Sequence, residues 1–198
     1  MLENFWQSIL QNKLEDLAVI ISIAGVWLTA KEKVINWPIG IIACLIYTYI
    51  FYKDALYGDT ALQVFYIAIG FYGWYEWLYG GEKKDELTVS KTSKKTWLIL
   101  CVLLIISWLV LANILSRTNT NVPYWDGLNT ALSLVATWMT TRKLIENWLI
   151  WIVTDLSYVG SYFYKDLNIT AILYFIFTLL AVYGYYQWER QLKETSFA

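Results

Sequence analysis

The sequence has no histidine, only two cysteines and few charged residues, and each shortage argues against a class of function. Without histidine, and with Cys44 and Cys101 far apart in apolar segments, we expect no metal site, no disulfide and no cofactor. No phosphate-binding loop and no nucleophile–base pair stands out, so nothing favours an enzyme. A net charge of −1 without a basic patch gives no reason to expect a nucleic-acid partner.

Apolar and aromatic residues are abundant instead. Apolar residues make up 58% of the 198 residues and charged residues 16%, against about 45–50% and about 25% in soluble domains. Twelve Trp and sixteen Tyr are present. Such rings suit the two interfaces of a membrane and cavities in which flat ligands stack. The composition therefore indicates an integral membrane protein in a lipid bilayer.

Seven apolar segments approach the length that an α-helix needs to cross a bilayer. The segment before the first of them, residues 1–13, is predicted to be a short interfacial segment with its apolar side chains on one side. The fifth segment is the shortest. The predicted spans are residues 14–30, 37–52, 60–79, 96–115, 127–141, 148–164 and 170–188.

The positive charges predict the orientation of these spans. Four of the fifteen Lys and Arg residues fall on the side of the N-terminus, and eleven fall on the opposite side. Since Lys and Arg are enriched in the cytoplasmic loops of membrane proteins, we expect the N-terminus outside and the C-terminus inside. The loop 81–95 and the tail 189–198 are then cytoplasmic.

An internal repeat with a period of about 111 residues runs through the chain. Asn36-Trp37 matches Asn147-Trp148, and further matches follow in the loops and later helices. Residues 14–80 and 116–188 are therefore expected to be two three-helix copies, with residues 96–115 as a linker helix. Because three helices plus one return the chain to its starting side, the copies are parallel, which predicts a transporter with a substrate site between them near midplane.

The two copies differ on one helical face. In the second copy this face presents an amide, an indole, a carboxylate and a phenol, spaced by four, four and three residues. In the first copy the middle of the face holds small residues. The two sets are Asn147, Trp151, Asp155 and Tyr158, and Asn36, Gly40, Cys44 and Tyr47. A cavity with one polar, aromatic wall and one recessed wall is expected.

Asp155 is the candidate of greatest interest, because a carboxylate near the centre of a span costs at least about 2.5 kcal/mol. A cationic substrate is its natural partner. The alternative is a structural hydrogen bond to a neighbouring hydroxyl, with a protonated Asp155. Gln63 is a second buried polar candidate, and an interhelical amide bond is its alternative role.

The remaining candidates each have two possible roles. Asn36 and Asn147 are either substrate ligands or helix N-caps, and Trp151 either stacks on a ligand or packs. Trp125-Asp126 is expected to cap the outer end of the fifth helix. Four further tryptophans are expected to be anchors at the cytoplasmic interface: Trp37, Trp77, Trp148 and Trp188.

Several blocks of the sequence resemble the PnuC-type vitamin transporters over about residues 15–190. They are residues 36–40, 62–66, 72–74, 125–126, 132–136, 141–143 and 146–151. The resemblance implies a three-plus-one-plus-three fold similar to that of the SWEET sugar carriers, and a homotrimer in the bacterial inner membrane. It also implies facilitated diffusion of an unphosphorylated vitamin that a cytoplasmic kinase then traps. The family's ligand-binding amide and indole fall on Asn147 and Trp151.

The family's best-known substrate is nicotinamide riboside, and a related branch carries thiamine. The nicotinamide riboside members have an Asn at the position of Asp155, so this chain departs from their pattern. Both vitamins carry a cationic aromatic ring, and the aminopyrimidine of thiamine could donate to a carboxylate. We place nicotinamide riboside first and thiamine second. A proton-coupled transporter that uses Asp155, and a receptor that transports nothing, are the remaining alternatives.

Overall fold

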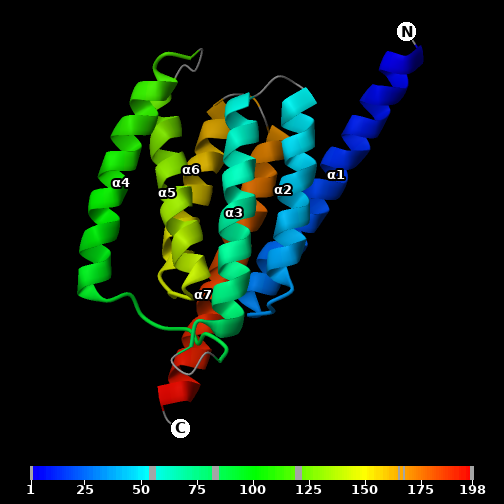
Figure 1. Cartoon of the computed structure of the whole chain (residues 1–198). Coiled ribbons are helices and arrows are strands. Elements are labelled where there is room, and N and C mark those ends of the chain that lie inside the picture. Colours follow the sequence, from blue (N-terminus) through cyan, green and yellow to red (C-terminus); the bar gives the residue numbers. More distant parts are fainter. Residues whose placement is uncertain are drawn as a thin grey trace. The chain divides into compact units, whose positions relative to one another are not determined.

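The computed structural model describes residues 2–53, 57–81, 85–118, 122–164, 166 and 168–196, with side chains from residue 13 to 194 apart from 57 and 58. Over these residues the chain forms seven helices (Figure 1). It divides into two compact units, Met1–Glu86 and Leu87–Ala198, each described here by itself. The all-helical prediction is thus confirmed over the described residues.

The first unit consists of α1 (Leu2–Ala30), α2 (Asn36–Lys53) and α3 (Tyr57–Tyr79). Helix α2 packs against both α1 and α3, and Figure 1 shows α2 and α3 running side by side. Helix α1 begins at Leu2, so residues 2–13 continue the first helix without a break. Their position at the membrane interface stays a prediction.

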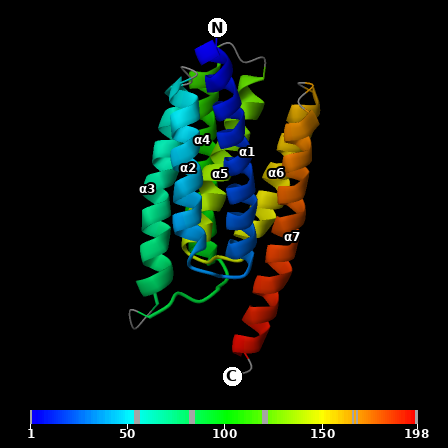
Figure 2. The same ribbon diagram turned by 90° about the vertical axis from the view of Figure 1, so that its right-hand side faces the viewer.

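The second unit consists of α4 (Lys94–Leu115), α5 (Pro123–Thr141), α6 (Asn147–Tyr164) and α7 (Asn168–Ser196). Each helix packs against the next one in the chain, as Figure 2 shows for α6 and α7. The linker helix of the sequence repeat therefore shares a compact unit with the second copy. A core of Leu100, Val135 and Met139 joins α4 to α5.

Two helix ends differ from the prediction. Helix α5 begins at Pro123, where a missing N–H costs nothing, so Trp125 and Asp126 lie in its first turn rather than capping it. Val122 occupies the cap position. Helix α7 continues past Trp188 through the predicted tail, where pairs one turn apart, such as Arg190 with Glu194, support an exposed helix.

Helix α4 exposes apolar side chains around most of its surface, as a lipid-facing helix does. By length and composition, two helices of the described part could cross a membrane, α4 and α7. The crossing of the other five stays a prediction. Cys101 is also exposed on α4. The large exposed apolar residues of α4 are Leu98, Ile99, Val102, Leu103, Ile105, Ile106, Leu109, Val110 and Ile114.

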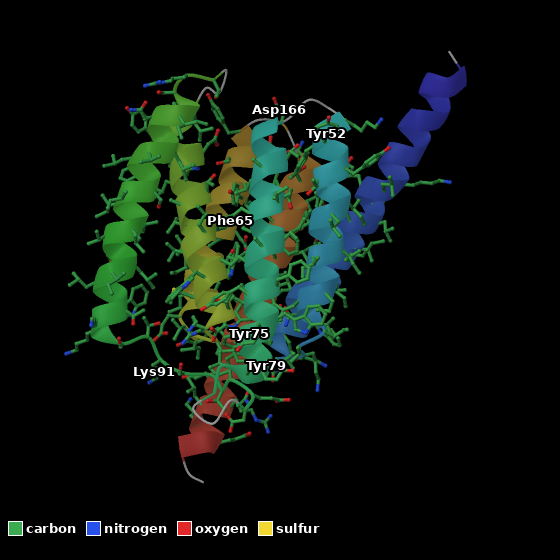
Figure 3. All side chains as sticks on the ribbon, in the orientation of Figure 1. Tyr52, Phe65, Tyr75, Tyr79, Lys91 and Asp166 are labelled. Carbon is green, nitrogen blue, oxygen red and sulfur yellow. The ribbon has the colours of Figure 1, made fainter. Side chains whose placement is uncertain are left out.

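Exposed aromatic side chains mark both ends of the α2–α3 pair (Figure 3). Tyr52 lies near the end of α2, whereas Tyr75 and Tyr79 lie near the end of α3, with ring centroids 5.4 Å apart. Because α2 and α3 are antiparallel neighbours, these rings lie at opposite ends of the pair. Exposed Phe65 lies between them along α3. This is the pattern of aromatic belts at the two membrane interfaces.

The four tryptophans predicted as interface anchors are instead buried, so that prediction is wrong. Trp37 and Trp77 pack edge to face with centroids 5.5 Å apart, and Trp148 and Trp188 do so at 5.3 Å. Gly73 of α3 leaves room for the indole of Trp37, and Gly184 of α7 leaves room for that of Trp148. A Cβ atom at either glycine would overlap the indole. Each pair locks two helices of its unit together.

Contacts inside α1–α3 recur inside α5–α7 at positions about 111 residues apart. Both tryptophan pairs follow this rule. The Asn of each Asn-Trp pair also bonds the residue three positions before it. Asn36 Nδ2 donates to Lys33 O, and Asn147 Nδ2 donates to Leu144 O. The other matched features are the hydroxyl bonds of Ser22 and Ser133, those of Thr29 and Thr140, and the left-handed φ angles of Glu32 and Lys143.

Candidate functional site

Asn147 opens α6 and is fully buried, with 0% of its surface exposed. Its Nδ2 donates to Leu144 O at 2.6 Å, and its Oδ1 lies 3.1 Å from Thr140 Oγ1, which can donate to it. The side chain therefore closes the α5–α6 turn by bonding a carbonyl. Its Nδ2 carries a second N–H that this bond does not use.

Trp151 lies one turn further along α6 and is half-buried. Its indole Nε1 donates to Thr140 Oγ1 over 3.4 Å, so a residue of α5 orients the ring. Thr140 thereby joins Asn147 and Trp151 in one cluster. The sequence analysis did not place Thr140 in the site, although its match with Thr29 in the repeat marks it as a structural position.

Asp155 is 4% exposed, one further turn along α6. Within the described part of the chain, no cation or hydroxyl forms a hydrogen bond or ion pair with its carboxylate. Its electrostatic neighbour is the Tyr174 phenol of α7. A buried carboxylate without a partner is costly, so the arrangement is suited to receive a cation.

Tyr158 completes this face of α6 and takes part in an aromatic cluster. Its ring lies 4.7 Å from Tyr174 and 5.9 Å from Tyr162, centroid to centroid, and Tyr162 stacks on Tyr174 at 5.2 Å. The Tyr158 hydroxyl interacts with Ser133 and Thr130 of α5. The sequence analysis missed Tyr162 and Tyr174. Tyr162 could have been found, because it follows Tyr158 by one helical turn.

The other two predicted site residues lie in the first unit. Asn36 is buried at the start of α2, and its Nδ2 donates to Lys33 O at 2.8 Å. Gln63 is half-buried on α3 and makes no hydrogen bond with any residue that the structure describes. The structure thus brings together the four predicted residues of α6, and places Asn36 and Gln63 on two other helices.

The turn before α6 is held by the segment that leads into α4. Ser90 N donates to Lys143 O and Ile145 N donates to Ser90 O, both at 3.0 Å, which forms a parallel β-bridge. Glu146 accepts from Thr92 N at 3.0 Å and from Thr92 Oγ1 at 2.7 Å. These bonds fix the backbone immediately before Asn147.

The comparisons with known proteins agree with one another. Residues 12–190 match the family model described as "Nicotinamide mononucleotide transporter". The chain is 27% identical to the nicotinamide riboside transporter PnuC of Escherichia coli (strain K12), over 91% of this chain and 87% of that protein. It is 24% identical to the riboflavin/roseoflavin transporter RibM of Streptomyces davaonensis, over 84% and 79%.

A solved structure shares the fold. The crystal structure of the vitamin B3 transporter PnuC superposes with a TM-score of 0.72 at 23% identity, and the match covers 91% of this chain and 82% of that one. The seven helices of the described residues therefore form a fold known from experiment.

Proposed function

Because the chain belongs to the nicotinamide mononucleotide transporter family, we propose that it is a membrane transporter for an unphosphorylated vitamin, in first place nicotinamide riboside. Relatives that bear the name nicotinamide riboside transporter match over most of their length. The family's description names the phosphorylated compound. In its ionised form Asp155 would repel a phosphate dianion but not the uncharged ribose of the riboside.

The observation that carries this proposal is the buried, unpartnered carboxylate of Asp155 one turn from a half-buried indole. Nicotinamide riboside has a positively charged pyridinium ring. Such a ring can stack on Trp151 and at the same time neutralise Asp155. Asn147 and Tyr158 are then the polar groups above and below the ring, and we propose Asn36 and Gln63 as ligands from the first unit.

Thiamine is the second candidate, and Asp155 is the observation that favours it. The exocyclic amine of its pyrimidine can donate to the carboxylate, which an Asn would accommodate less well. The relative RibM is named for riboflavin, whose ring system is neutral. A neutral ring would leave Asp155 without a charge partner, so riboflavin is a useful negative comparison.

The proposed architecture is two parallel three-helix repeats joined by α4, as in the SWEET carriers, in a homotrimer of the bacterial inner membrane with its N-terminus outside. The sequence repeat and its matched contacts support the two-repeat architecture, and the uneven distribution of Lys and Arg supports the orientation. The homotrimer and the bacterial inner membrane rest on the family resemblance alone. We propose facilitated diffusion with trapping by a cytoplasmic kinase. The titratable group that interacts with Asp155 in the second unit is the phenol of Tyr174, which at neutral pH is a poor proton acceptor.

The test is uptake into proteoliposomes that contain the purified protein and no kinase. We expect labelled nicotinamide riboside to equilibrate without an imposed gradient, and unlabelled nicotinamide riboside to compete more strongly than thiamine or riboflavin. In a parallel experiment with an imposed proton gradient, accumulation above equilibrium that a protonophore abolishes would instead establish proton coupling. Stronger competition by thiamine would move the protein to the second candidate, and binding without flux would remove the transporter assignment.

A further inference from the structure

Asn129 of α5 is a buried polar residue that the site described above does not include. It is 1% exposed, and its Oδ1 accepts from Ser157 Oγ of α6 at 2.6 Å. Its Nδ2 has no hydrogen-bond partner among the described residues. Turning the amide over would leave Oδ1 unpaired instead, so one end of this side chain is unpartnered in either orientation.

A comparison of the two copies of the repeat distinguishes Asn129 Nδ2 from other buried polar atoms without a hydrogen-bond partner. Four side-chain polar atoms of the described chain are completely inaccessible and unpartnered, and two of them are Trp37 Nε1 and Trp148 Nε1, which occupy matching positions. They therefore belong to the common scaffold. The other two are Asn129 Nδ2 and Ser161 Oγ, and both lie in the second unit. Their counterparts about 111 residues earlier are the buried apolar residues Ala18 and Ile50.

Two hydroxyl groups bind Asn129, one at its amide and one at its backbone. Ser157 binds its amide, Ser133 Oγ donates to its backbone carbonyl at 2.9 Å, and the Tyr158 hydroxyl interacts with Ser133. Hydroxyls both donate and accept, so this environment matches a polyol better than it matches a charged or an aromatic group. No charged side chain takes part in these bonds.

Open space lies beside this polar cluster. A groove of about 220 Å³ runs between the start of α5 and the end of α6, lined by Val122, Trp125, Gly160, Ser161 and Tyr164. Trp125 precedes Asn129 by one helical turn, and Ser161 follows Ser157 by one turn. Ser161 therefore lines the groove, and Asn129 lies one helical turn from a residue that lines it.

Ser157 lies six residues beyond Trp151, which is about 9 Å along the axis of α6 and about 120° around it. A molecule whose aromatic ring lies between Trp151 and Asp155 would therefore have to direct its sugar along α6 and round towards α5 to bring a hydroxyl to Asn129.

We propose that Asn129 is a specificity-determining residue that donates its free Nδ2 hydrogen to a ribose hydroxyl of the substrate, with Ser157 holding the amide in position. This rests on the proposed function, because it takes a nucleoside as the cargo. Asn129 thus recognises the sugar, while Trp151 and Asp155 bind the charged ring.

The test compares the purified full-length wild type with Asn129→Ala by calorimetric titration with nicotinamide riboside and its 2′-deoxy and 3′-deoxy analogues. The substitution copies Ala18, which the first unit already accommodates at the matching position. We expect about a tenfold loss of affinity for nicotinamide riboside, the size of one hydrogen bond, and no loss for the one analogue that lacks the bonded hydroxyl. Asn113→Ala, an exposed amide on α4, is the matched control and should change nothing.

Each other outcome is decisive. An equal loss for all three ligands, or no loss for any, means that Asn129 packs or binds water, and this overturns the proposal while the transport function stands. A wild type that binds no nicotinamide riboside overturns both the proposal and the proposed function. Thermal unfolding of Asn129→Ala close to that of the wild type shows that a loss of affinity is not a loss of fold.

Discussion

The helices α1–α3 and α5–α7 share their internal contacts and differ in their polar chemistry. Tryptophan pairs, capping amides and hydroxyl bonds recur in both. The first set has small or apolar residues where the second has functional groups: Ala18 for Asn129, Gly40 for Trp151, Cys44 for Asp155 and Ile46 for Ser157. The comparison separates residues that build the three-helix unit from residues that act on a substrate.

The turn between the first two helices of each set differs as well. Glu146 binds Thr92, and the turn from 142 to 147 is bridged to Ser90. In the first set the counterpart of Glu146 is Ile35, which is 54% exposed. The second set is therefore braced next to its candidate ligand Asn147.

The largest effect is expected when Asp155 of α6 is replaced by Cys, the residue at the matching position of α2. Asp155→Cys should lower the affinity for nicotinamide riboside at least about 100-fold, about 3 kcal/mol, because the cationic ring loses its buried counter-charge. Calorimetric titration measures this. Asp16→Cys, which removes an exposed carboxylate of α1, is the control and should bind like the wild type. Tight binding by Asp155→Cys would show that the carboxylate does not face the substrate.

The next substitution removes the indole. Trp151→Gly copies Gly40 and should cost about 2 kcal/mol of binding free energy, since one stacked ring contributes roughly 1–3 kcal/mol. Trp151→Phe keeps a stacking face and loses only the bond to Thr140, so it should retain most of the affinity. Equal losses in both variants would mean that the Nε1 bond, rather than stacking, matters. The same titration provides the measurement.

A third pair tests whether the scaffolds are equivalent. Gly73→Ala and Gly184→Ala should each lower the free energy of unfolding by about 1–3 kcal/mol, because the added Cβ overlaps Trp37 or Trp148. Thermal unfolding in detergent reports the change. Gly40→Ala and Gly160→Ala are controls, since their Cβ atoms meet nothing within 4 Å and should be neutral or slightly stabilising. A large effect at only one of Gly73 and Gly184 would contradict the equivalence.

The smallest effect is expected at the braced turn. Thr92→Val removes the hydroxyl bond to Glu146 and should weaken nicotinamide riboside binding a few-fold, about 1 kcal/mol, through a looser Asn147. Amide hydrogen exchange should speed up at Ser90 and Ile145, whose N–H groups form the bridge. Ile35→Ala, in the unbraced turn, should leave both measurements unchanged. Faster exchange with unaltered binding would make the brace purely structural.

The sequence alone was sufficient for the helix count over the described residues and for the grouping of Asn147, Trp151, Asp155 and Tyr158, since helical spacing fixes which residues share a face. It did not predict Thr140, Asn129 or Tyr174. These residues lie on other helices, and their contacts with α6 depend on how side chains interlock between helices. Periodicity within one helix carries no information about that register.

The prediction that four tryptophans lie at the membrane interface was wrong for a related reason. Composition places a ring near the end of a span, but an indole there can face either headgroups or a neighbouring helix. Trp37 and Trp148 face a neighbour because Gly73 and Gly184 leave room for them. A buried tryptophan is distinguished from an interfacial one by a small residue that lies opposite it on the neighbouring helix. Both copies of the repeat contain such a pairing, Trp37 with Gly73 and Trp148 with Gly184.

The membership of α4 in the second compact unit bears on how the protein is made. Synthesis runs from the N-terminus, so α1–α3 can complete their own contacts before α4 leaves the ribosome. Helix α4 is then synthesised ahead of α5 and presents Leu100, against which Val135 and Met139 pack. A gene divided after the codon for Glu86 would give each product all the helix partners that it uses within its own unit, and the two products could be synthesised as separate chains.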